Sequence, residues 1–376
     1  MTEIKIPVKE IREGLTKLII PRDYLKKIHF FNPRVELSRD MTILVLNTLN
    51  PKDWIVCDVL AGIGARGIRI AKECRVKKVF LNDISEDNIP LMRKNISLNL
   101  LKNKVNIINR DANQILSDNI RLFDYIDIDP WGSPSYYFDS VARAIKRKGF
   151  IGFSATDTAA LCGTSPITCL RRYGIESYKT DFFKELGLRI LIANAALTFG
   201  KWSFSFKPLL SYASEHYFRV FAEVEKGKSI ASKTLEQNLG YVNYCSKCLW
   251  RKIDEEPIIK CEFCDSKTKV IGKIWTGKIE ELKFLQTCLE ELIQTNWLKT
   301  ENKIKNLISL LKNETIPFYY DVHRICQKNK FEIPKFEILQ QKLRDKGNVA
   351  ERTHFSYKGI KTDLSLKEMI ETISEF

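Results

Sequence analysis

The chain has 376 residues, of which 44% are hydrophobic and 28% charged, a composition that excludes a disordered protein and predicts two domains. No apolar run reaches the roughly 20 residues of a membrane-spanning helix, and Met1–Arg12 lacks the apolar segment of a signal peptide. We therefore expect a cytoplasmic protein that does not contact membranes.

The net charge of +15 is spread along the chain. Residues 1–225 hold 34 Lys and Arg against 25 Asp and Glu, and residues 226–376 hold 27 against 21. A broad positive field attracts polyanions, of which nucleic acid is the commonest. A merely basic solvated surface would show the same excess, so charge alone indicates such a partner without establishing it.

Strands and helices alternate through the first two thirds of the chain. After an N-terminal extension (residues 1–50, with a short strand and a helix near 39–49), strands are predicted at 54–60, 78–82, 104–109, 125–129 and 149–154. Helices are predicted from 67–73, at 85–100 with Ser85 as N-cap, and at 135–144. This alternation predicts an α/β fold with a mainly parallel sheet covered on both faces.

Less regular segments follow this alternation. Strands at 203–212 and 216–224 are predicted to close the sheet edge, residues 227–237 read as a polar linker, and residues 278–376 as mostly amphipathic helices. We expect the lone histidines, including His354, to be structural.

A glycine-rich turn follows the first strand of the sheet. Asp58 opens it, and Gly62, Gly64 and Gly67 have G-x-G-x-x-G spacing, which is a weak signal alone because dinucleotide enzymes share it. Asp83 and Asp111 then follow the second and third strands. A carboxylate after the second strand can accept both ribose hydroxyls, and one after the third can face an adenine amine, which fits S-adenosylmethionine better than NAD. Helix caps or solvated turns are the alternative for each acid.

The fourth strand ends in Asp129-Pro130-Trp131-Gly132, the most specific local pattern in the chain. An exocyclic amine on a nucleobase is a poor nucleophile because its lone pair is shared with the ring. Asp129 can accept a hydrogen bond from that amine and orient it, and Trp131 can stack on an extruded base. A structural turn with an ordinary tryptophan is the alternative.

Four of the ten cysteines form two pairs, Cys245-x-x-Cys248 and Cys261-x-x-Cys264. Two such knuckles can supply a tetrahedral Zn²⁺ site, and four thiolates leave no position open for catalysis. We therefore predict a structural zinc module over about 241–275, with an iron–sulfur cluster as a less favoured occupant. Flanking Lys247, Arg251, Lys252 and Lys260 would suit a nearby phosphate.

With these motifs in place, the chain resembles the tRNA (guanine-26-N2)-dimethyltransferase family from about residue 5 to 375. That family carries Asp-Pro-Phe-Gly where this chain has Asp129–Gly132, and usually Asn where this chain has Ser38. Further matching stretches are Phe31-Asn32-Pro33 with Arg39-Asp40, Ala155–Thr158, His216–Val220, Arg352–Phe355 and Gly359–Asp363.

The resemblance implies a Rossmann-like class I methyltransferase domain over 1–230 and a smaller tRNA-binding domain over 231–376. It implies cofactor contacts from Arg39, Arg66, Asp83, Asp111 and Ala112, beside Asp58, Gly62 and Gly64 of the loop. Asp129, helped by Trp131, would be catalytic. Arg39 follows from the resemblance alone, and its fork could hold the cofactor carboxylate. We expect a monomer that dimethylates guanine 26 of tRNA.

Three other functions remain open. A DNA amino-methyltransferase shares the logic of acid, proline and aromatic residue, but usually has a second proline that this chain lacks. A nucleic-acid-binding protein with an inactive methyltransferase fold would not need the intact glycine loop or Asp129. An NAD-dependent dehydrogenase would leave the Asp129–Gly132 turn without a role.

Overall fold

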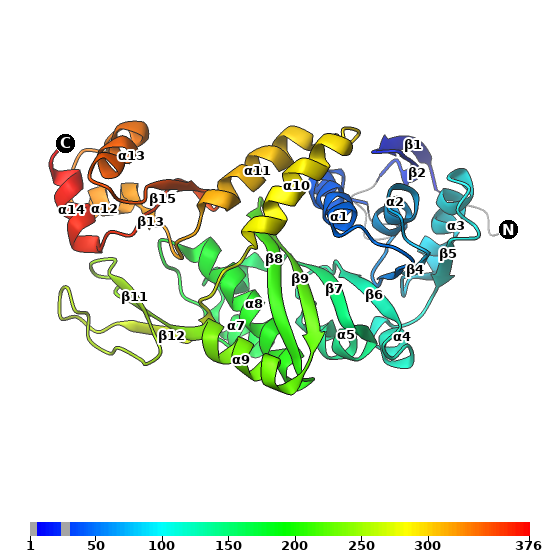
Figure 1. The fold of residues 1–376 in the computed structure, drawn as a ribbon, viewed down its shortest axis with the longest axis horizontal. Coiled ribbons are helices and arrows are strands. Elements are labelled where there is room, and N and C mark those ends of the chain that lie inside the picture. Colours follow the sequence, from blue (N-terminus) through cyan, green and yellow to red (C-terminus); the bar gives the residue numbers. More distant parts are fainter. Residues whose placement is uncertain (1–5, 24–30) are drawn as a thin grey trace.

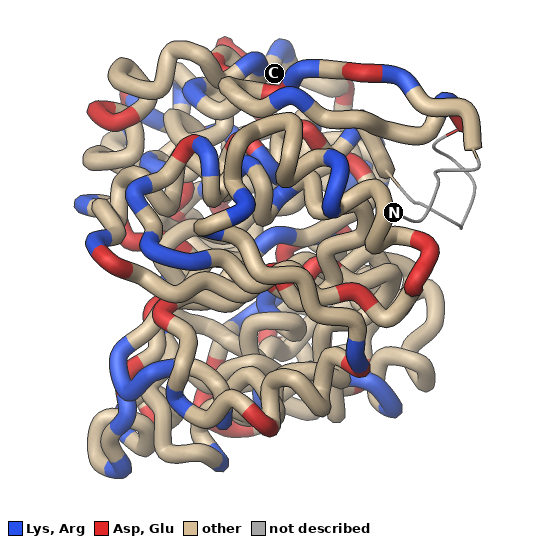
Figure 2. Tube along the Cα trace, turned by 90° about the vertical axis from the view of Figure 1, so that its right-hand side faces the viewer, with Lys and Arg blue, Asp and Glu red and all other residues tan. Residues whose placement is uncertain are grey.

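A computed structural model describes residues 6–23 and 31–376 (Figure 1). Segments 1–5 and 24–30 of the predicted N-terminal extension lie outside the described residues. Within the described part, no helix is both long and apolar enough to cross a membrane. Figure 2 shows acidic residues interspersed among the lysines and arginines rather than segregated from them.

A seven-stranded sheet in the order β5-β4-β3-β6-β7-β9-β8 forms the centre of the N-terminal part of the chain. The first five strands are parallel, and β9 and β8 extend the sheet antiparallel. This confirms the predicted parallel sheet and the two closing strands. Their bounds are β3 Ile55–Asp58, β4 Lys78–Asn82, β5 Val105–Ile108, β6 Phe123–Ile128, β7 Ile145–Ala155, β8 Phe204–Ser214 and β9 Tyr217–Lys226.

Helices cover both faces of this sheet. One apolar core joins the sheet to α4, α5 and α8, and a second joins its other face to α1, α2 and α3. Helix α8 is buried along most of its length, which explains the strong apolar run near 190–199. The bounds are α1 Glu36–Leu49, α2 Ala65–Glu73, α3 Ile89–Leu98, α4 Ala112–Asp118, α5 Phe138–Ala144, α6 Thr158–Leu161, α7 Pro166–Tyr173 and α8 Phe183–Lys201.

The N-terminal extension supplies a hairpin, β1 Val8–Glu13 and β2 Thr16–Pro21, beside α1. Asn95 of α3 accepts from the Ile19 amide at 2.6 Å and donates to the Ile19 carbonyl at 3.2 Å. The side-chain amide therefore continues the backbone ladder of β2 and fixes the hairpin against the sheet domain.

The predicted linker at 227–237 is wrong, because these residues form helix α9, Lys228–Asn238. Its polar composition suggested a linker, but Ala231 is buried, and Leu235 packs against the β-carbon position of Gly200 in α8. A helix on the surface of a domain needs only a narrow apolar stripe, and two residues at i and i+4 provide it here.

The chain beyond α9 forms three pieces (Figure 1). A three-stranded sheet, β11-β10-β12, holds the cysteine pairs, and a second, β13-β15-β14, lies among helices near the C-terminus. Helices α10 and α11 pack back on α1 in the apolar core of the sheet domain. The bounds are β10 Leu239–Tyr244, β11 Arg251–Asp254, β12 Lys269–Trp275, α10 Leu282–Gln294, α11 Glu301–Asn313, β13 Tyr320–Asp321, α12 Val322–Asn329, α13 Phe336–Asp345, β14 Glu351–Thr353, β15 Ser356–Lys361 and α14 Leu366–Ser374.

A buried charge network joins the C-terminal sheet to α8. Glu185 pairs with Arg189 at 2.9 Å and with Lys361 at 3.2 Å, and Lys361 also reaches Glu314 at 3.4 Å. His354 completes the network, since its Nδ1 lies 2.7 Å from Glu314 and its Nε2 accepts from the Ala213 amide at 3.2 Å. These contacts give His354 the structural role that we expected.

Candidate active site and metal centre

Four carboxylates follow four adjacent strands of the central sheet. Asp111, Asp83, Asp58 and Asp129 come at or just after the ends of β5, β4, β3 and β6, which are neighbours in this order. Since these strands are parallel, the four acids lie along one edge of the sheet. The carboxyl edge is where open α/β sheets bind ligands.

The glycine loop is held closed by Asp58. Its Oδ2 accepts from the Gly67 amide at 2.9 Å. Gly64 precedes α2 with φ +84, a left-handed conformation that favours glycine. A β-carbon on Gly67 would lie 2.1 Å from Leu81 Cδ2, so the Leu81 side chain or α2 would have to shift if another residue stood there. The structure thus explains the last two glycines of the motif.

Two cavities open on either side of this loop and share Leu60 and Gly62. The smaller, about 90 Å³, lies between the loop and α1, and Arg39, Asp58, Arg66 and Asp129 contribute to its wall. The larger, about 440 Å³, is lined by Leu60, Gly62, Asp83, Ser85, Asn88, Pro130, Trp131 and Tyr137. Its volume falls within the roughly 300–1,000 Å³ typical of small-molecule sites.

Asp83 fixes the loop from the side of β4. Its Oδ2 accepts from the Gly62 amide at 2.8 Å, and its Oδ1 accepts from the Ser85 amide at 2.9 Å and from Asn88 Nδ2 at 3.1 Å. Ser85 occupies the predicted N-cap position, at the start of the 3-10 turn Glu86–Asn88 that leads into α3, but its side chain makes no capping bond. The carboxylate of Asp83 accepts from the backbone amides of Gly62 and Ser85.

Asp111 is the N-cap of α4 and accepts from the amides of Asn113 and Gln114. The cap interpretation therefore holds for this residue. Its side chain remains exposed at the sheet edge, whereas Ala112 is buried. A capping carboxylate with one oxygen engaged can still accept a further hydrogen bond.

Arg66 connects the loop to the end of β6. It forms an ion pair with Asp129 and lies 3.2 Å from Asp127, and its Nη1 donates to Thr42 Oγ1 at 2.6 Å. Arg66 is 5% exposed and the Asp129 side chain 29% exposed. The residue predicted for the cofactor and the residue predicted for catalysis are therefore one electrostatic unit.

Asp127 and Arg219 extend this unit, and sequence reasoning did not identify either as part of the site. Both are fully buried and form an ion pair, and Arg219 Nη1 also donates to Ser154 Oγ at 3.2 Å. The sequence nevertheless contains a feature that points to each of these residues. Asp127 lies two residues before Asp129, on the same face of β6, and Arg219 is the single charge in an apolar stretch of β9, where a buried cation requires a partner.

The charges in this unit shift the pKa values of the two carboxyls in opposite directions. Burial raises the pKa of Asp58 to about 7, with repulsion from Asp127 acting in the same direction. Burial alone would raise the pKa of Asp129 as well, but the guanidinium groups of Arg66 and Arg219 outweigh it and hold that pKa below its usual value. Asp129 is therefore an ionised acceptor at neutral pH, and Asp58 is poised between its two forms.

The turn that carries Trp131 is tied to the end of β7. The Gly132 amide donates to Thr156 Oγ1 at 2.7 Å, and the Thr156 amide donates to the Gly132 carbonyl at 3.0 Å. Trp131 is 63% exposed, which is unusual for so large a ring, and it lines the larger cavity beside Tyr137. An exposed ring on a fixed turn can stack on a ligand.

Arg39 lies in the wall of the smaller cavity, but its fork already has a partner. Its Nε and Nη2 donate to the two carboxylate oxygens of Glu13 at 2.7 and 2.6 Å, and its Nη1 donates to the Asn32 carbonyl at 3.1 Å. The bidentate geometry that the resemblance suggested for a cofactor carboxylate is thus used within the protein. Arg39 could meet a ligand here only beside Glu13 or by exchanging it.

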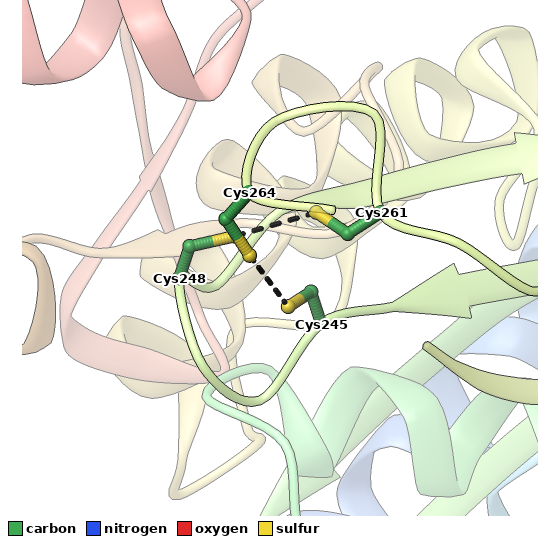
Figure 3. Close-up of side chains that lie close together, drawn as sticks. All are labelled: Cys245, Cys248, Cys261 and Cys264. Carbon is green, nitrogen blue, oxygen red and sulfur yellow. Dashed lines mark hydrogen bonds between the residues drawn. The ribbon is translucent and has the colours of Figure 1, made fainter. Parts of the chain in front are cut away.

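The four paired cysteines converge as predicted (Figure 3). All four Sγ atoms lie within 4.8 Å of one another, and two pairs, Cys245–Cys264 and Cys248–Cys261, are 3.5 Å apart. Tetrahedral Zn–S bonds of about 2.3 Å place sulfur atoms roughly 3.8 Å apart, so the donor set fits one zinc ion.

The two knuckles also share a backbone geometry. The amide of Leu249 donates to the Cys245 carbonyl and that of Asp265 to the Cys261 carbonyl, and both donors are left-handed, at φ +75 and +58. The flanking basic residues are less available than predicted. Arg251 is buried against Asp181, Lys252 pairs with Glu262 and Lys260 with Asp265, whereas exposed Lys247 has no ion pair among the described residues.

Comparison with known proteins gives one consistent result. Residues 12–374 match the family of N2,N2-dimethylguanosine tRNA methyltransferases. Relatives named tRNA (guanine(26)-N(2))-dimethyltransferase from Pyrococcus horikoshii and Methanobrevibacter smithii are 34% and 37% identical, covering 98% and 100% of this chain and 99% of each relative. The solved structure of Trm1 from Pyrococcus horikoshii with S-adenosyl-L-methionine is 35% identical, with a TM-score of 0.90 over 97% of this chain and 99% of that one.

Proposed function

This chain belongs to the N2,N2-dimethylguanosine tRNA methyltransferase family, and on that premise we propose that it transfers methyl groups from S-adenosylmethionine to the exocyclic N2 of guanine 26 in tRNA. Two successive transfers give N2,N2-dimethylguanosine. The observation that carries this proposal is the ion pair between Arg66 and Asp129, which joins a glycine loop to an acid at the end of β6.

The cofactor fits the loop and its two cavities. A β-carbon at Gly67 would displace the Leu81 side chain or α2, and Asp58 and Asp83 hold the Gly67 and Gly62 amides in place. We assign Asp83 to the ribose, Asp111 and Ala112 to the adenine, and Asp58 with Gly62, Gly64, Arg66 and Arg39 to the amino-acid end. S-adenosylmethionine, when bound, supplies an electrophilic methyl group.

Asp129 orients the amine that attacks. Arg66 donates to its Oδ2, and in this proposal Oδ1 accepts a hydrogen bond from the guanine amino group. That hydrogen bond keeps electron density on nitrogen and directs the lone pair toward the methyl carbon. Trp131 stacks on the extruded base from the exposed side of the turn. As the new C–N bond forms, the bond between the methyl carbon and the cofactor sulfur would break, leaving a neutral thioether, and the proton lost by nitrogen would pass to Asp129 or to water.

The C-terminal part binds the tRNA in this proposal. We assign residues 1–230 to the methyltransferase domain and 231–376 to tRNA binding, with zinc in the four-cysteine site as a structural ion. The zinc module contacts the C-terminal helices, since Lys328 Nζ donates to the Lys247 carbonyl at 2.8 Å. Ten thiols without a disulfide fit a reducing cytoplasm, where we expect the protein to act as a monomer.

The direct test is methyl transfer from labelled S-adenosylmethionine to unmodified tRNA transcripts, followed by nucleoside mass spectrometry. The proposal predicts N2-methylguanosine and N2,N2-dimethylguanosine, and no label in a transcript with adenine at position 26. Label on another atom or base would contradict the assignment. Transfer to duplex DNA without transfer to tRNA would favour the DNA amino-methyltransferase instead.

A further inference from the structure

The sheet face that carries Asp129 also carries two buried hydroxyls without a hydrogen-bond partner among the described residues, those of Tyr212 and Tyr217. Tyr212 is fully buried and Tyr217 is 7% exposed. Their rings meet edge to face, with 6.1 Å between centroids. A buried unpartnered hydroxyl is rare in native proteins and requires an explanation, of which an absent ligand is one.

The strand register places Tyr217 on the same sheet face as Asp129, two strands away. Ile128 of β6 pairs with Phe153, and Ser154 pairs with Arg219, so Asp129, Ser154 and Arg219 share the next row across the sheet. Side chains alternate along a strand. Tyr217 therefore lies on the same face as Arg219, two residues before it at the start of antiparallel β9 and just beyond the carboxyl end of β7.

The electrostatics agree with this placement. Burial raises the pKa of Tyr217, and the Asp129 carboxylate acts in the same direction, so the hydroxyl keeps its proton at neutral pH and can donate. The nearby hydroxyls of Tyr212 and Ser214 lower the pKa of Tyr217. Neither of them forms a hydrogen bond of normal geometry with the Tyr217 hydroxyl. The hydroxyl of Tyr217 thus has no hydrogen-bond partner among the described residues.

The order of the strands decides which ligand atom Tyr217 would meet. The cofactor loop lies at β3 and β4, Asp129 at β6, and Tyr217 at β9, two strands further from the cofactor. Neighbouring strands are about 4.8 Å apart, so the ends of β6 and β9 are separated by roughly 10 Å, which a purine and a tyrosine ring together can span. The amine N2 and the oxygen O6 stand at the two ends of the Watson–Crick edge of guanine. When N2 lies at Asp129, this edge can direct O6 toward β9.

We propose that the hydroxyl of Tyr217 donates a hydrogen bond to O6 of the target guanine and thereby determines specificity for that base. This inference rests on the proposed function, because it requires guanine N2 to lie at Asp129. Tyr217 is a binding residue in this account and does not take part in the bond changes. Tyr212 lies on the outer strand β8, opposite Arg219, and has no such role.

The test compares tRNA transcripts carrying guanine or 6-thioguanine at the target position. The thio analogue keeps the N1 proton and the N2 amine but replaces O6 with a poor acceptor. Wild-type protein should methylate guanine about tenfold faster under single-turnover conditions, the effect expected of one hydrogen bond. Tyr217→Phe should methylate both bases at similar, lowered rates. Tyr212→Phe, the matched control, should keep the wild-type ratio.

The outcomes separate this inference from the function on which it rests. A wild-type protein that does not methylate the guanine transcript contradicts the proposed function. A wild-type protein that methylates both transcripts equally overturns the role of O6, whether or not the Tyr217→Phe protein folds. A Tyr217→Phe protein that unfolds at the wild-type temperature and keeps the wild-type ratio overturns the role of Tyr217.

Discussion

Arg66 donates to Asp129 Oδ2 while standing in the first turn of the helix that follows the glycine loop. The same guanidinium reaches Asp127 at 3.2 Å and Thr42 at 2.6 Å. One side chain therefore links the proposed cofactor loop, the proposed catalytic acid and helix α1. Because Arg66 contacts both the loop and Asp129, we expect it to be essential to both cofactor binding and methyl transfer.

Arg66→Lys should lower the rate of methyl transfer by about tenfold to a hundredfold. A lysine ammonium cannot donate to Asp127 and Asp129 at the same time, as the planar guanidinium group of arginine does. Cofactor affinity should fall as well. Single-turnover kinetics and equilibrium dialysis measure the two effects. Arg110→Lys, at an exposed arginine paired with Asp118, is the control and should change neither. An Arg66→Lys protein with normal kinetics would refute the link.

Asp83→Ala should weaken cofactor binding by about tenfold to a hundredfold and leave the transfer rate at saturating cofactor nearly unchanged. The substitution removes the proposed acceptor for the ribose and leaves the Gly62 and Ser85 amides without their partner. Titration calorimetry gives the affinity, with Asp87→Ala, an exposed acid of the following turn, as the control. A reduced transfer rate at unchanged affinity would place Asp83 outside the cofactor site.

Cofactor affinity should rise with pH as Asp58 ionises. Burial raises the pKa of this carboxyl to about 7, so the folded protein holds it protonated below that value and ionised above it. The cofactor ammonium prefers the ionised form. Since the unfolded chain ionises this carboxyl at a lower pH than the folded protein does, the free energy of unfolding of the unliganded protein falls as pH rises toward 7. Binding measured at about pH 6 and pH 7.5 should show the rise, and Asp58→Asn should abolish it. An unchanged pH dependence in Asp58→Asn would assign the titration to another group.

One zinc ion per chain should be found by metal analysis. Removal by a chelator should lower the unfolding midpoint by at least roughly 5 °C, because four converging thiolates then repel or remain buried and unpaired. Cys245→Ser should have the same effect. Cys162→Ser, at a half-buried thiol outside the cluster, should keep both the metal and the unfolding midpoint. Iron in place of zinc would favour the cluster alternative.

Local patterns predicted most of the fold and the site. The spacing of Gly62, Gly64 and Gly67 and the Asp129–Gly132 turn lie within single strand–turn–helix units, and their chemistry depends on neighbours in sequence. Helix α9 was misread because a surface helix can be almost entirely polar. Asp127 and Arg219 were missed for a different reason, since their ion pair joins residues 92 positions apart, and no local pattern states which buried arginine meets which buried acid.

Arg39 illustrates the remaining limit of sequence reasoning. The family resemblance alone indicated Arg39, as a partner for the cofactor carboxylate. Glu13 takes that place from the hairpin of the N-terminal extension. The pairing depends on how β1 and β2 pack beside α1, a tertiary contact that neither spacing nor composition specifies.

The proposed role of Asp129 is tested by single-turnover methyl transfer by Asp129→Asn on a tRNA transcript, with cofactor binding measured on the same protein. Asparagine preserves the shape of the side chain but removes the charge that orients the amine. We predict that Asp129→Asn lowers the transfer rate by about a hundredfold or more and leaves the cofactor affinity within a few fold of wild type. The control Asp139→Asn, at an exposed acid of α5, should keep normal activity. An Asp129→Asn protein that keeps most of its transfer rate would contradict the account.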